Sequence, residues 1–208
     1  MIRTFIINPR AGRGLAPADI AAMEARFRPL GPAEFIIPAS REETSAATRA
    51  ALMKGADQII AVGGDGTVNA VVNGFFENGV PVKPEARLAV SCSGSGCDYY
   101  ASITKAAPGT DWRELVACHG VRWVDVGRIR FANAAYGERI FINMASAGMI
   151  ADVVIKRERW NGCLPDWLAY TIPSAMSLFT FRPRAMEIVV DGEARRLEAL
   201  AGSVSKGS

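Results

Sequence analysis

The chain has 208 residues, of which half are hydrophobic and 22% are charged, so its composition is that of a globular protein and not of a disordered one. This length allows one large domain, or one small domain and part of another. The net charge of +3 is too small to indicate nucleic acid as a partner. Four scattered cysteines and a single histidine argue against a zinc site or a disulfide framework, and favour a reducing cytoplasm. We expect neither a signal peptide nor a membrane-spanning helix.

Strands and helices alternate over the first half of the chain. Short apolar runs predict strands at residues 2–7, 34–37, 59–62 and 87–92. Helical spacing of apolar residues predicts helices at about 17–27, 41–54 and 68–75. Ser40 stands where the second helix would begin, with Glu43 completing a capping box, and Gly55 would end that helix. This alternation predicts an α/β fold with a parallel sheet and right-handed crossovers.

Three glycine-rich turns each follow one of these strands. Their sequences are NPRAGRG (residues 8–14), GGDGT (63–67) and SGSGCD (93–98). In parallel α/β sheets, ligands bind outside the carboxyl ends of the strands. The three turns are therefore expected to meet at one edge of the sheet and to form a ligand site there.

The GGDGT turn has the features of a phosphate-binding site. It lies between a strand and the start of a helix, where backbone N–H groups and the helix dipole attract anions and glycines permit close approach. Thr67 is expected at or next to the helix N-cap. Asp65 is unusual, because a carboxylate repels phosphate unless a metal ion or a reacting hydroxyl lies between them. The alternative is a tight turn in which the glycines only relieve backbone strain.

The pattern changes after Gly120, and we place a domain boundary there, between residues 1–120 and 121–208. Two antiparallel strands are expected at 121–131 and 139–144, and a hairpin at 185–197. Helices are expected at 147–159 and 165–178, while the tail from Ala201 shows no strand pattern. The second domain is thus expected to be an incomplete, mainly antiparallel β domain with a helical insertion.

The order NPRAGRG, GGDGTVNAVVNG, SGSGCDYYA resembles the diacylglycerol kinase catalytic domain, which bacterial lipid kinases, sphingosine kinases and ceramide kinases share. VDVGRI (124–129) and FINMASAG (141–148) also resemble that family. The resemblance implies a nucleotide-binding α/β domain, a β-sandwich second domain, and ATP-dependent phosphorylation of a lipid hydroxyl in the cleft between them. NAD kinases and phosphofructokinases share the GGDGT element alone.

The resemblance also implies a set of site residues. The nucleotide would contact Asn8, Pro9, Gly12, Gly14 and Ser40. Its phosphates would be held by Gly63, Gly64, Asp65, Gly66 and Thr67, and the third motif would contribute Gly94, Ser95 and Asp98. Mg²⁺ would accompany ATP with unknown protein ligands, and Asp65 would be the catalytic carboxylate that orients the lipid hydroxyl or holds magnesium-bound water.

Four positions depart from the family pattern. Ala70 replaces a Glu, Cys97 an Asn, Ser95 a Thr and Cys92 a Pro. Our first hypothesis is a lipid kinase acting on a diacylglycerol-like lipid or a long-chain alcohol. The alternative is a catalytically impaired or truncated nucleotide-binding remnant of such a kinase, and a weaker third hypothesis is an NAD-kinase-like enzyme with a soluble substrate. For the kinase we expect a cytoplasmic protein, peripheral at the inner membrane face, that meets its lipid at a membrane surface, and we leave a homodimer open.

Overall fold

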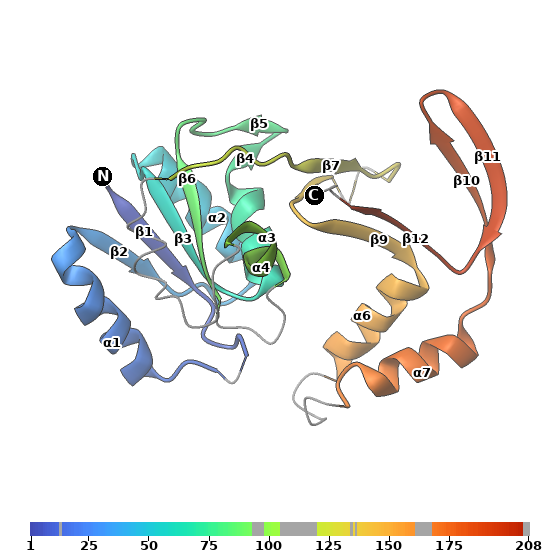
Figure 1. Cartoon of the computed structure of the whole chain (residues 1–208), viewed down its shortest axis with the longest axis horizontal. Helices are drawn as coiled ribbons and strands as arrows, with labels where there is room; N and C mark the ends of the chain where they lie inside the picture. Colours follow the sequence, from blue (N-terminus) through green and yellow to red (C-terminus); the bar gives the residue numbers. More distant parts are fainter. Residues whose placement is uncertain are drawn as a thin grey trace. The chain divides into compact units, whose positions relative to one another are not determined.

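The computed structural model describes residues 1–12, 14–92, 98–104, 120–133, 135, 137–160 and 168–205 (Figure 1). The chain divides into two compact units, Met1–Asn143 and Met144–Gly207. Each unit is described separately below. The domain boundary expected after residue 120 stays a prediction.

The first unit is built on a parallel sheet of four strands. In chain order these are β1 (Arg3–Ile7), β2 (Ala33–Ile36), β3 (Gln58–Gly63) and β6 (Arg87–Cys92). Their order in the sheet is β2-β1-β3-β6, and every neighbouring pair is parallel. The α/β class with a parallel sheet is thereby confirmed.

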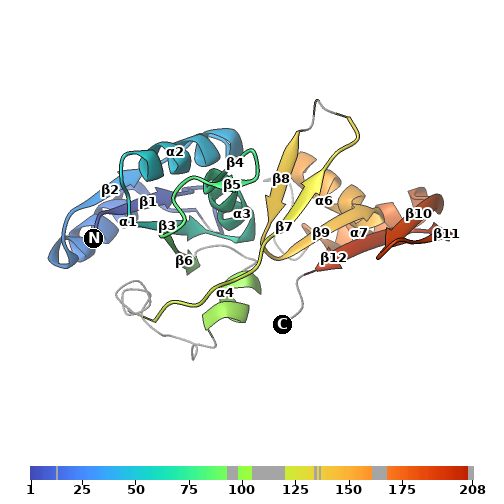
Figure 2. The same ribbon diagram turned by 90° about the horizontal axis from the view of Figure 1, so that it is seen from above.

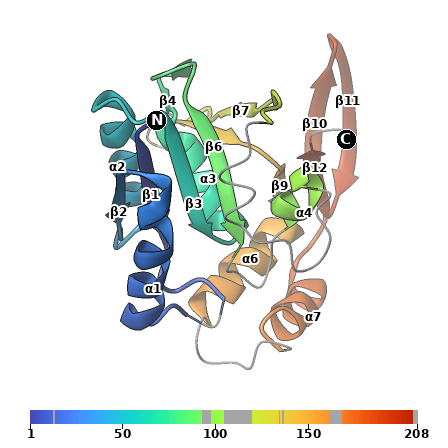
Figure 3. The same cartoon turned by 60° about the vertical axis from the view of Figure 1, so that its left-hand side comes forward.

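Helices cover both faces of this sheet (Figure 2). They are α1 (Pro17–Phe27), α2 (Arg41–Met53) and α3 (Asp65–Gly74), with a short 3-10 helix, η1 (Arg28–Leu30), after α1. Successive strand residues point to opposite faces, so Phe5 packs on the side of α1 and Ile6 on the side of α2 and α3. Figure 3 shows α1 in front of the sheet. Both residues are fully buried, so each face contributes its own part of the core.

The start and end of α2 follow the local sequence. Ser40 is the N-cap, and its Oγ accepts a hydrogen bond from the Glu43 amide at 3.1 Å. The Glu43 carboxylate in turn accepts a bond from the amide of Ala39 at 2.7 Å. Gly55 follows the helix with a φ of 102°, a backbone conformation that favours glycine. The predicted capping residues are confirmed.

Small residues bring α2 and α3 into close contact. The Ser45 hydroxyl donates to the carbonyl of Ala70 at 2.8 Å. A Cβ on Gly74 would lie 2.4 Å from the Thr48 Cβ and 2.6 Å from the Ser45 carbonyl oxygen, so no side chain fits there. The two helices therefore have a fixed separation and register.

The described residues of the first unit form five further elements. They are β4 (Phe76–Glu77), β5 (Val80–Pro81), α4 (Asp98–Thr104), β7 (Gly127–Arg130) and β8 (Glu138–Phe141). β7 and β8 pair antiparallel, as predicted. The side-chain amide of Asn73, in α3, donates to the carbonyl of Ile140 at 2.8 Å and accepts from its N–H at 2.9 Å. Asn73 thus pairs with the backbone carbonyl and N–H of Ile140, in β8, as a neighbouring strand would.

Lys83 ties three segments together at the amino end of the sheet. Its ammonium group donates to the carbonyls of Gly55 and Ala56 at 2.9 and 3.0 Å and to the Asp57 carboxylate at 2.8 Å. Asp57 also accepts a bond from the amide of Ile2 at 2.7 Å. The hydrogen bond from Lys83, followed by the one from Ile2, lowers the pKa of Asp57 below its ordinary value of 3.8.

Replacing Lys83 with Met is expected to lower the free energy of unfolding by about 1 to 3 kcal/mol at neutral pH, since a charged donor to three acceptors is lost. Because the pKa of Asp57 is lowered in the folded state, its stabilisation is present above the ordinary value and lost as the pH falls through the lowered one. The variant should therefore lose less stability on acidification. Urea unfolding at about pH 7 and pH 3 measures both effects, with the exposed Lys54→Met as control. Equal stability of the two variants would contradict the prediction.

The described residues of the second unit form two helices and two antiparallel strand pairs. The helices are α6 (Met149–Arg159) and α7 (Thr171–Thr180). The strands are β9 (Met144–Gly148), β10 (Arg184–Val190), β11 (Glu193–Ala199) and β12 (Ala201–Ser205). The hairpin of β10 and β11 confirms the prediction for residues 185–197. The helix expected at 165–178 lies partly outside the described residues, and its described part begins only at Thr171.

Two predictions for this unit are wrong. Ala147 and Gly148 belong to strand β9 and not to a helix, and the tail forms strand β12, which pairs antiparallel with β9. A Cβ on Gly148 would lie 2.5 Å from the carbonyl oxygen of Leu200. The two backbones thus approach so closely that small residues are required, which removes the apolar alternation by which strands are recognised.

A polar cluster joins α6 to α7. The Lys156 ammonium donates to the Asp152 carboxylate and to the hydroxyls of Ser177 and Thr180. Ser177, which is fully buried, donates to Asp152 at 2.8 Å. The hydrogen bonds from Lys156 and then Ser177 lower the pKa of Asp152. Every polar group in the cluster has a partner in the cluster, so its role is to pair the two helices.

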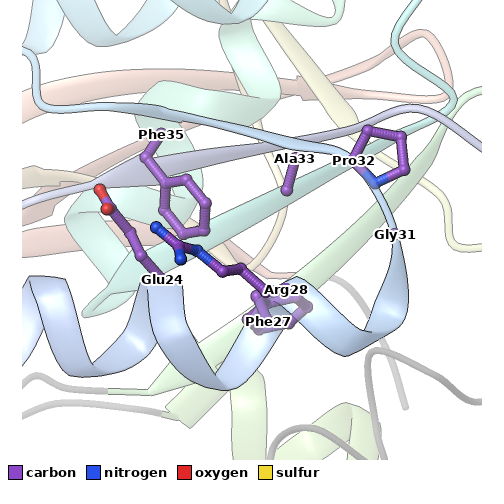
Figure 4. Close-up of a pocket in the computed structure, with 7 residues that line it drawn as sticks. All are labelled: Glu24, Phe27, Arg28, Gly31, Pro32, Ala33 and Phe35. Atoms are coloured by element: carbon purple, nitrogen blue, oxygen red, sulfur yellow. The ribbon is translucent and has the colours of Figure 1, made fainter.

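The described residues form no membrane-spanning helix, and some of them line a hollow beside α1. Among the residues described, no helix is both long and apolar enough to cross a bilayer. A hollow beside α1 is shown in Figure 4 and is lined by Glu24, Phe27, Arg28, Gly31, Pro32, Ala33 and Phe35. Ala33 pairs with Arg3 at the first residues of β2 and β1. The hollow thus lies at the amino edge of the sheet, away from the glycine-rich turns.

Candidate functional site

The first two glycine-rich turns lie side by side at the carboxyl edge of the sheet, as predicted. The NPRAGRG turn follows β1 and the GGDGT turn follows β3, and these strands are parallel neighbours. β6, next to β3, ends at Cys92. Gly94 and Ser95 lie outside the described residues, so the third turn is represented here only by Asp98, the first residue of α4.

The first turn is fastened to the second by a side-chain hydrogen bond. The Asn8 amide donates to the Thr67 hydroxyl at 3.0 Å, while its oxygen accepts from the backbone of Arg10 at 3.0 Å. The Asn8 backbone N–H donates to the carbonyl of Val62, in β3, at 2.9 Å. Pro9 accepts a backbone bond from Leu15 at 2.8 Å, which closes the turn. Asn8 therefore has a structural role in addition to any contact with a ligand.

The same edge of the sheet also carries Gly12 and Gly14, in the turn after β1, and Ser40, after β2. Gly12 and Gly14 have φ angles of 62° and 84° and are exposed, so the first turn needs glycine at both positions. Ser40 follows β2 and is also exposed, but its hydroxyl caps α2. These three residues border the carboxyl edge of the sheet.

Thr67 does not cap α3, and the prediction that placed it at or next to the N-cap is wrong. The N-cap is Gly64, whose carbonyl accepts bonds from the amides of Thr67 and Val68 at 2.9 and 3.1 Å. Thr67 is buried one turn into the helix, and a Cβ on Gly63 would lie 2.4 Å from its hydroxyl oxygen. Gly63 is therefore glycine because the Thr67 side chain, held by Asn8, occupies the space beside it.

Asp65 turns its carboxylate toward α4. One oxygen accepts a bond from the amide of Asp98 and the other from the amide of Tyr99, both at 3.1 Å. These amides begin α4, where the helix dipole favours a negative charge. Each carboxylate oxygen can accept a further bond, so Asp65 can still receive a proton or bind a water molecule. The sequence did not signal this contact, because a backbone amide 33 residues away leaves no pattern.

This arrangement suits a bound phosphate. No side chain of the described residues caps the N-terminus of α3, and Gly66 is exposed there. The Asp65 carboxylate accepts hydrogen bonds from two amides of α4, which direct it away from the start of α3. No group of three or more metal-binding side chains occurs among the described residues.

Two residues near the site, Tyr99 and Ala70, are buried. Tyr99 is 5% exposed, and burial raises the pKa of its phenol. Ala70, which stands where the resembled family has Glu, is 7% exposed and contributes its carbonyl to the contact with α2. Cys92, at the end of β6, is disulfide-bonded in the structure.

Similar proteins are found among the bacterial diacylglycerol kinases. A diacylglycerol kinase of Bacillus subtilis (strain 168) is 30% identical over 194 residues, which cover 91% of this chain and 59% of that protein. One of Staphylococcus haemolyticus is 25% identical and is covered to 56% of its length. A solved diacylglycerol kinase structure from Bacillus anthracis has a TM-score of 0.65 at 21% identity, covers 99% of this chain and 64% of that one, and so shows the fold.

The chain thus spans less than two thirds of the length of these relatives. The profile of the diacylglycerol kinase catalytic domain matches residues 3–129, which is more than half of the chain and includes all three glycine-rich turns. The chain belongs to the diacylglycerol kinase catalytic domain family.

Proposed function

We propose that this protein is an ATP-dependent lipid kinase that phosphorylates the hydroxyl of a diacylglycerol-like lipid or a long-chain alcohol. The observation that carries the proposal is the junction of the first two glycine-rich turns through Asn8 and Thr67, beside a helix N-terminus that no described side chain caps. A helix N-terminus with exposed glycines binds phosphate groups through its backbone N–H groups. Because the chain belongs to the diacylglycerol kinase catalytic domain family, we propose that the phosphate bound at this site is transferred.

In the proposed reaction, the γ-phosphate of ATP lies at the start of α3. The lipid hydroxyl oxygen forms a bond to the γ-phosphorus as the bond to the bridging oxygen of ADP breaks. Asp65 orients this hydroxyl and accepts its proton, while α4 holds the carboxylate in place. Mg²⁺, when bound with ATP, would neutralise phosphate charge. Positioning and charge neutralisation supply most of the rate enhancement in such transfers.

The lipid acceptor requires that the protein meet a membrane surface. We propose a peripheral, transient encounter from the cytoplasm. Exposed apolar residues on α7, Leu178 and Phe179, are available for it, with side chains 63% and 79% exposed. Basic residues follow them at Arg182 and Arg184, and such a combination favours an anionic interface.

The test is calorimetric titration of the full chain with ATP, with and without Mg²⁺, followed by labelled-phosphate transfer to mixed diacylglycerol micelles. Binding with transfer is the expected result. Binding without transfer would instead support a nucleotide-binding remnant. No binding at all would refute the phosphate site and with it the proposed function.

A further inference from the structure

We infer that Asn73, near the end of α3, is a positioning residue for the lipid acceptor of the proposed kinase. This inference deepens the proposed function and rests on it. Asn73 belongs to the motif GGDGTVNAVVNG (63–74), whose first part makes the phosphate turn. It lies about 12 Å along the helix axis from Asp65, too far to touch the reacting atoms. Any effect of Asn73 on phosphoryl transfer must therefore pass through other parts of the chain.

The Asn73 side chain binds the backbone of β8 through both of its polar groups. Its amide nitrogen donates to the carbonyl of Ile140 at 2.8 Å, and its oxygen accepts from the Ile140 N–H at 2.9 Å. The nitrogen also donates to the carbonyl of Asn69, one turn earlier in α3, at 2.8 Å. Both amide hydrogens are thus engaged. A short planar group with a neutral donor and an acceptor is needed for this pairing, and neither aspartate nor serine provides one.

These hydrogen bonds fix a strand that burial alone would hold less strictly. Ile140 and Ile142 are 5% and 4% exposed, and they belong to the same apolar core cluster as the inner face of α3. Apolar burial is non-directional, whereas hydrogen bonds require a defined distance and angle. Gly74, next to Asn73, is closed against α2. The end of α3 is therefore locked on two sides, and β8 takes its register from this helix.

The register of β8 matters because of where the chain goes next. β8 ends at Phe141, and the second unit begins at Met144. The exposed apolar residues in the proposed encounter with lipid, Leu178 and Phe179, belong to that second unit. One end of α3 thus carries the phosphate turn, and the other end holds the strand from which the chain enters the second unit.

Phosphoryl transfer is sensitive to this kind of link. A misplacement of about 1 Å can slow a reaction about 100-fold, even where its cause lies far from the reacting atoms. Without Asn73, the phosphate turn and its bound nucleotide stay in place, while β8 loses its register on α3. Asn73 therefore acts on the lipid acceptor and not on the nucleotide, and this selectivity separates its role from a general effect on stability.

The test compares Asn73→Ala and Asn73→Ser with the wild-type chain in labelled-phosphate transfer to mixed diacylglycerol micelles, with ATP affinity measured by calorimetry. The serine hydroxyl can donate back to the Asn69 carbonyl, so Asn73→Ser loses only the bonds to Ile140. In both variants kcat/KM for diacylglycerol should fall about 10- to 100-fold, while ATP affinity changes less than about twofold. The amide hydrogen of Ile140 should exchange faster with solvent in both variants.

Lys83→Met is the matched control. It is expected to destabilise the same unit, but the partners of Lys83 are residues 55–57, at the amino end of the sheet. Its kcat/KM for diacylglycerol should equal that of the wild type at a temperature where every chain is folded, as thermal unfolding shows. An equal fall in this control would overturn the inference, because lost stability alone would then explain the effect.

Wild-type transfer in both Asn73 variants would overturn the inference and leave the proposed function intact. Equal losses of ATP affinity and of transfer would also overturn it, because Asn73 would then act through the phosphate turn. An unchanged exchange rate at Ile140 would contradict the contact itself. A wild-type chain that transfers no phosphate to lipid would refute the proposed function and this inference together.

Discussion

Replacing Asp65 with Asn is expected to lower the rate of phosphoryl transfer to a lipid hydroxyl by about 10²- to 10⁴-fold, the range typical of a lost general base. An amide cannot accept the proton, and it places an NH₂ group against one of the two amides of α4 that the carboxylate now binds at 3.1 Å. The measurement is labelled-phosphate transfer under saturating ATP, with ATP affinity determined by calorimetry on the same sample. Affinity should change less than the rate.

A matched control separates chemistry from structure. Asp19 also places a carboxylate at a helix N-terminus, where it accepts a bond from the amide of Ala16 at 2.8 Å. Asp19→Asn should cost about 0.5 to 1 kcal/mol of stability and leave transfer unchanged. Full activity of Asp65→Asn would remove Asp65 from the mechanism. A fall in ATP affinity as large as the fall in rate would make Asp65 a positioning residue that acts through α4.

The local chemistry of the first unit is readable from the sequence, whereas contacts between distant turns are not. Ser40, Glu43 and Gly55 delimit α2 as predicted, because capping depends on residues a few positions apart. The predicted phosphate turn also lies at the predicted edge. The sequence suggests only a local capping role for Thr67, because the residue that holds its hydroxyl, Asn8, lies 59 residues away. The surroundings of the Asp65 carboxylate are likewise not readable from the sequence, because the amides that bind it lie 33 and 34 residues away, in α4.

The errors in the second unit have a different physical cause. β9 and β12 are joined over a long stretch of chain, and their residues are mostly small, so neither shows the alternation of large apolar and polar side chains. The hairpin of β10 and β11 was found because a tight Asp191-Gly192 turn joins its strands directly. The pairing of strands that a tight turn joins is thus readable from the sequence, whereas the close approach of two distant strands is not.

Replacing Gly74 with Ala is expected to lower the free energy of unfolding by about 3 kcal/mol, at the upper end of the usual cost of overpacking. The new methyl group would lie 2.4 Å from the Thr48 Cβ and 2.6 Å from the Ser45 carbonyl oxygen, so α3 must move away from α2. Alanine in place of glycine normally stabilises a helix by about 1 kcal/mol, which offsets only part of this cost. Urea unfolding of the full chain gives the difference directly.

Gly66→Ala is the control for this effect, since it makes the same change in the same helix. Its methyl group would lie 3.7 Å from the Arg41 guanidinium, which is an ordinary contact. Its stability should therefore match or slightly exceed that of the wild type. Because the contacts between α2 and α3 set the position of the GGDGT turn at the start of α3, Gly74→Ala should also weaken ATP binding, although Gly74 lies two turns from that turn. Wild-type stability in Gly74→Ala would show that α2 and α3 can separate without cost, and would contradict the fixed register of the two helices.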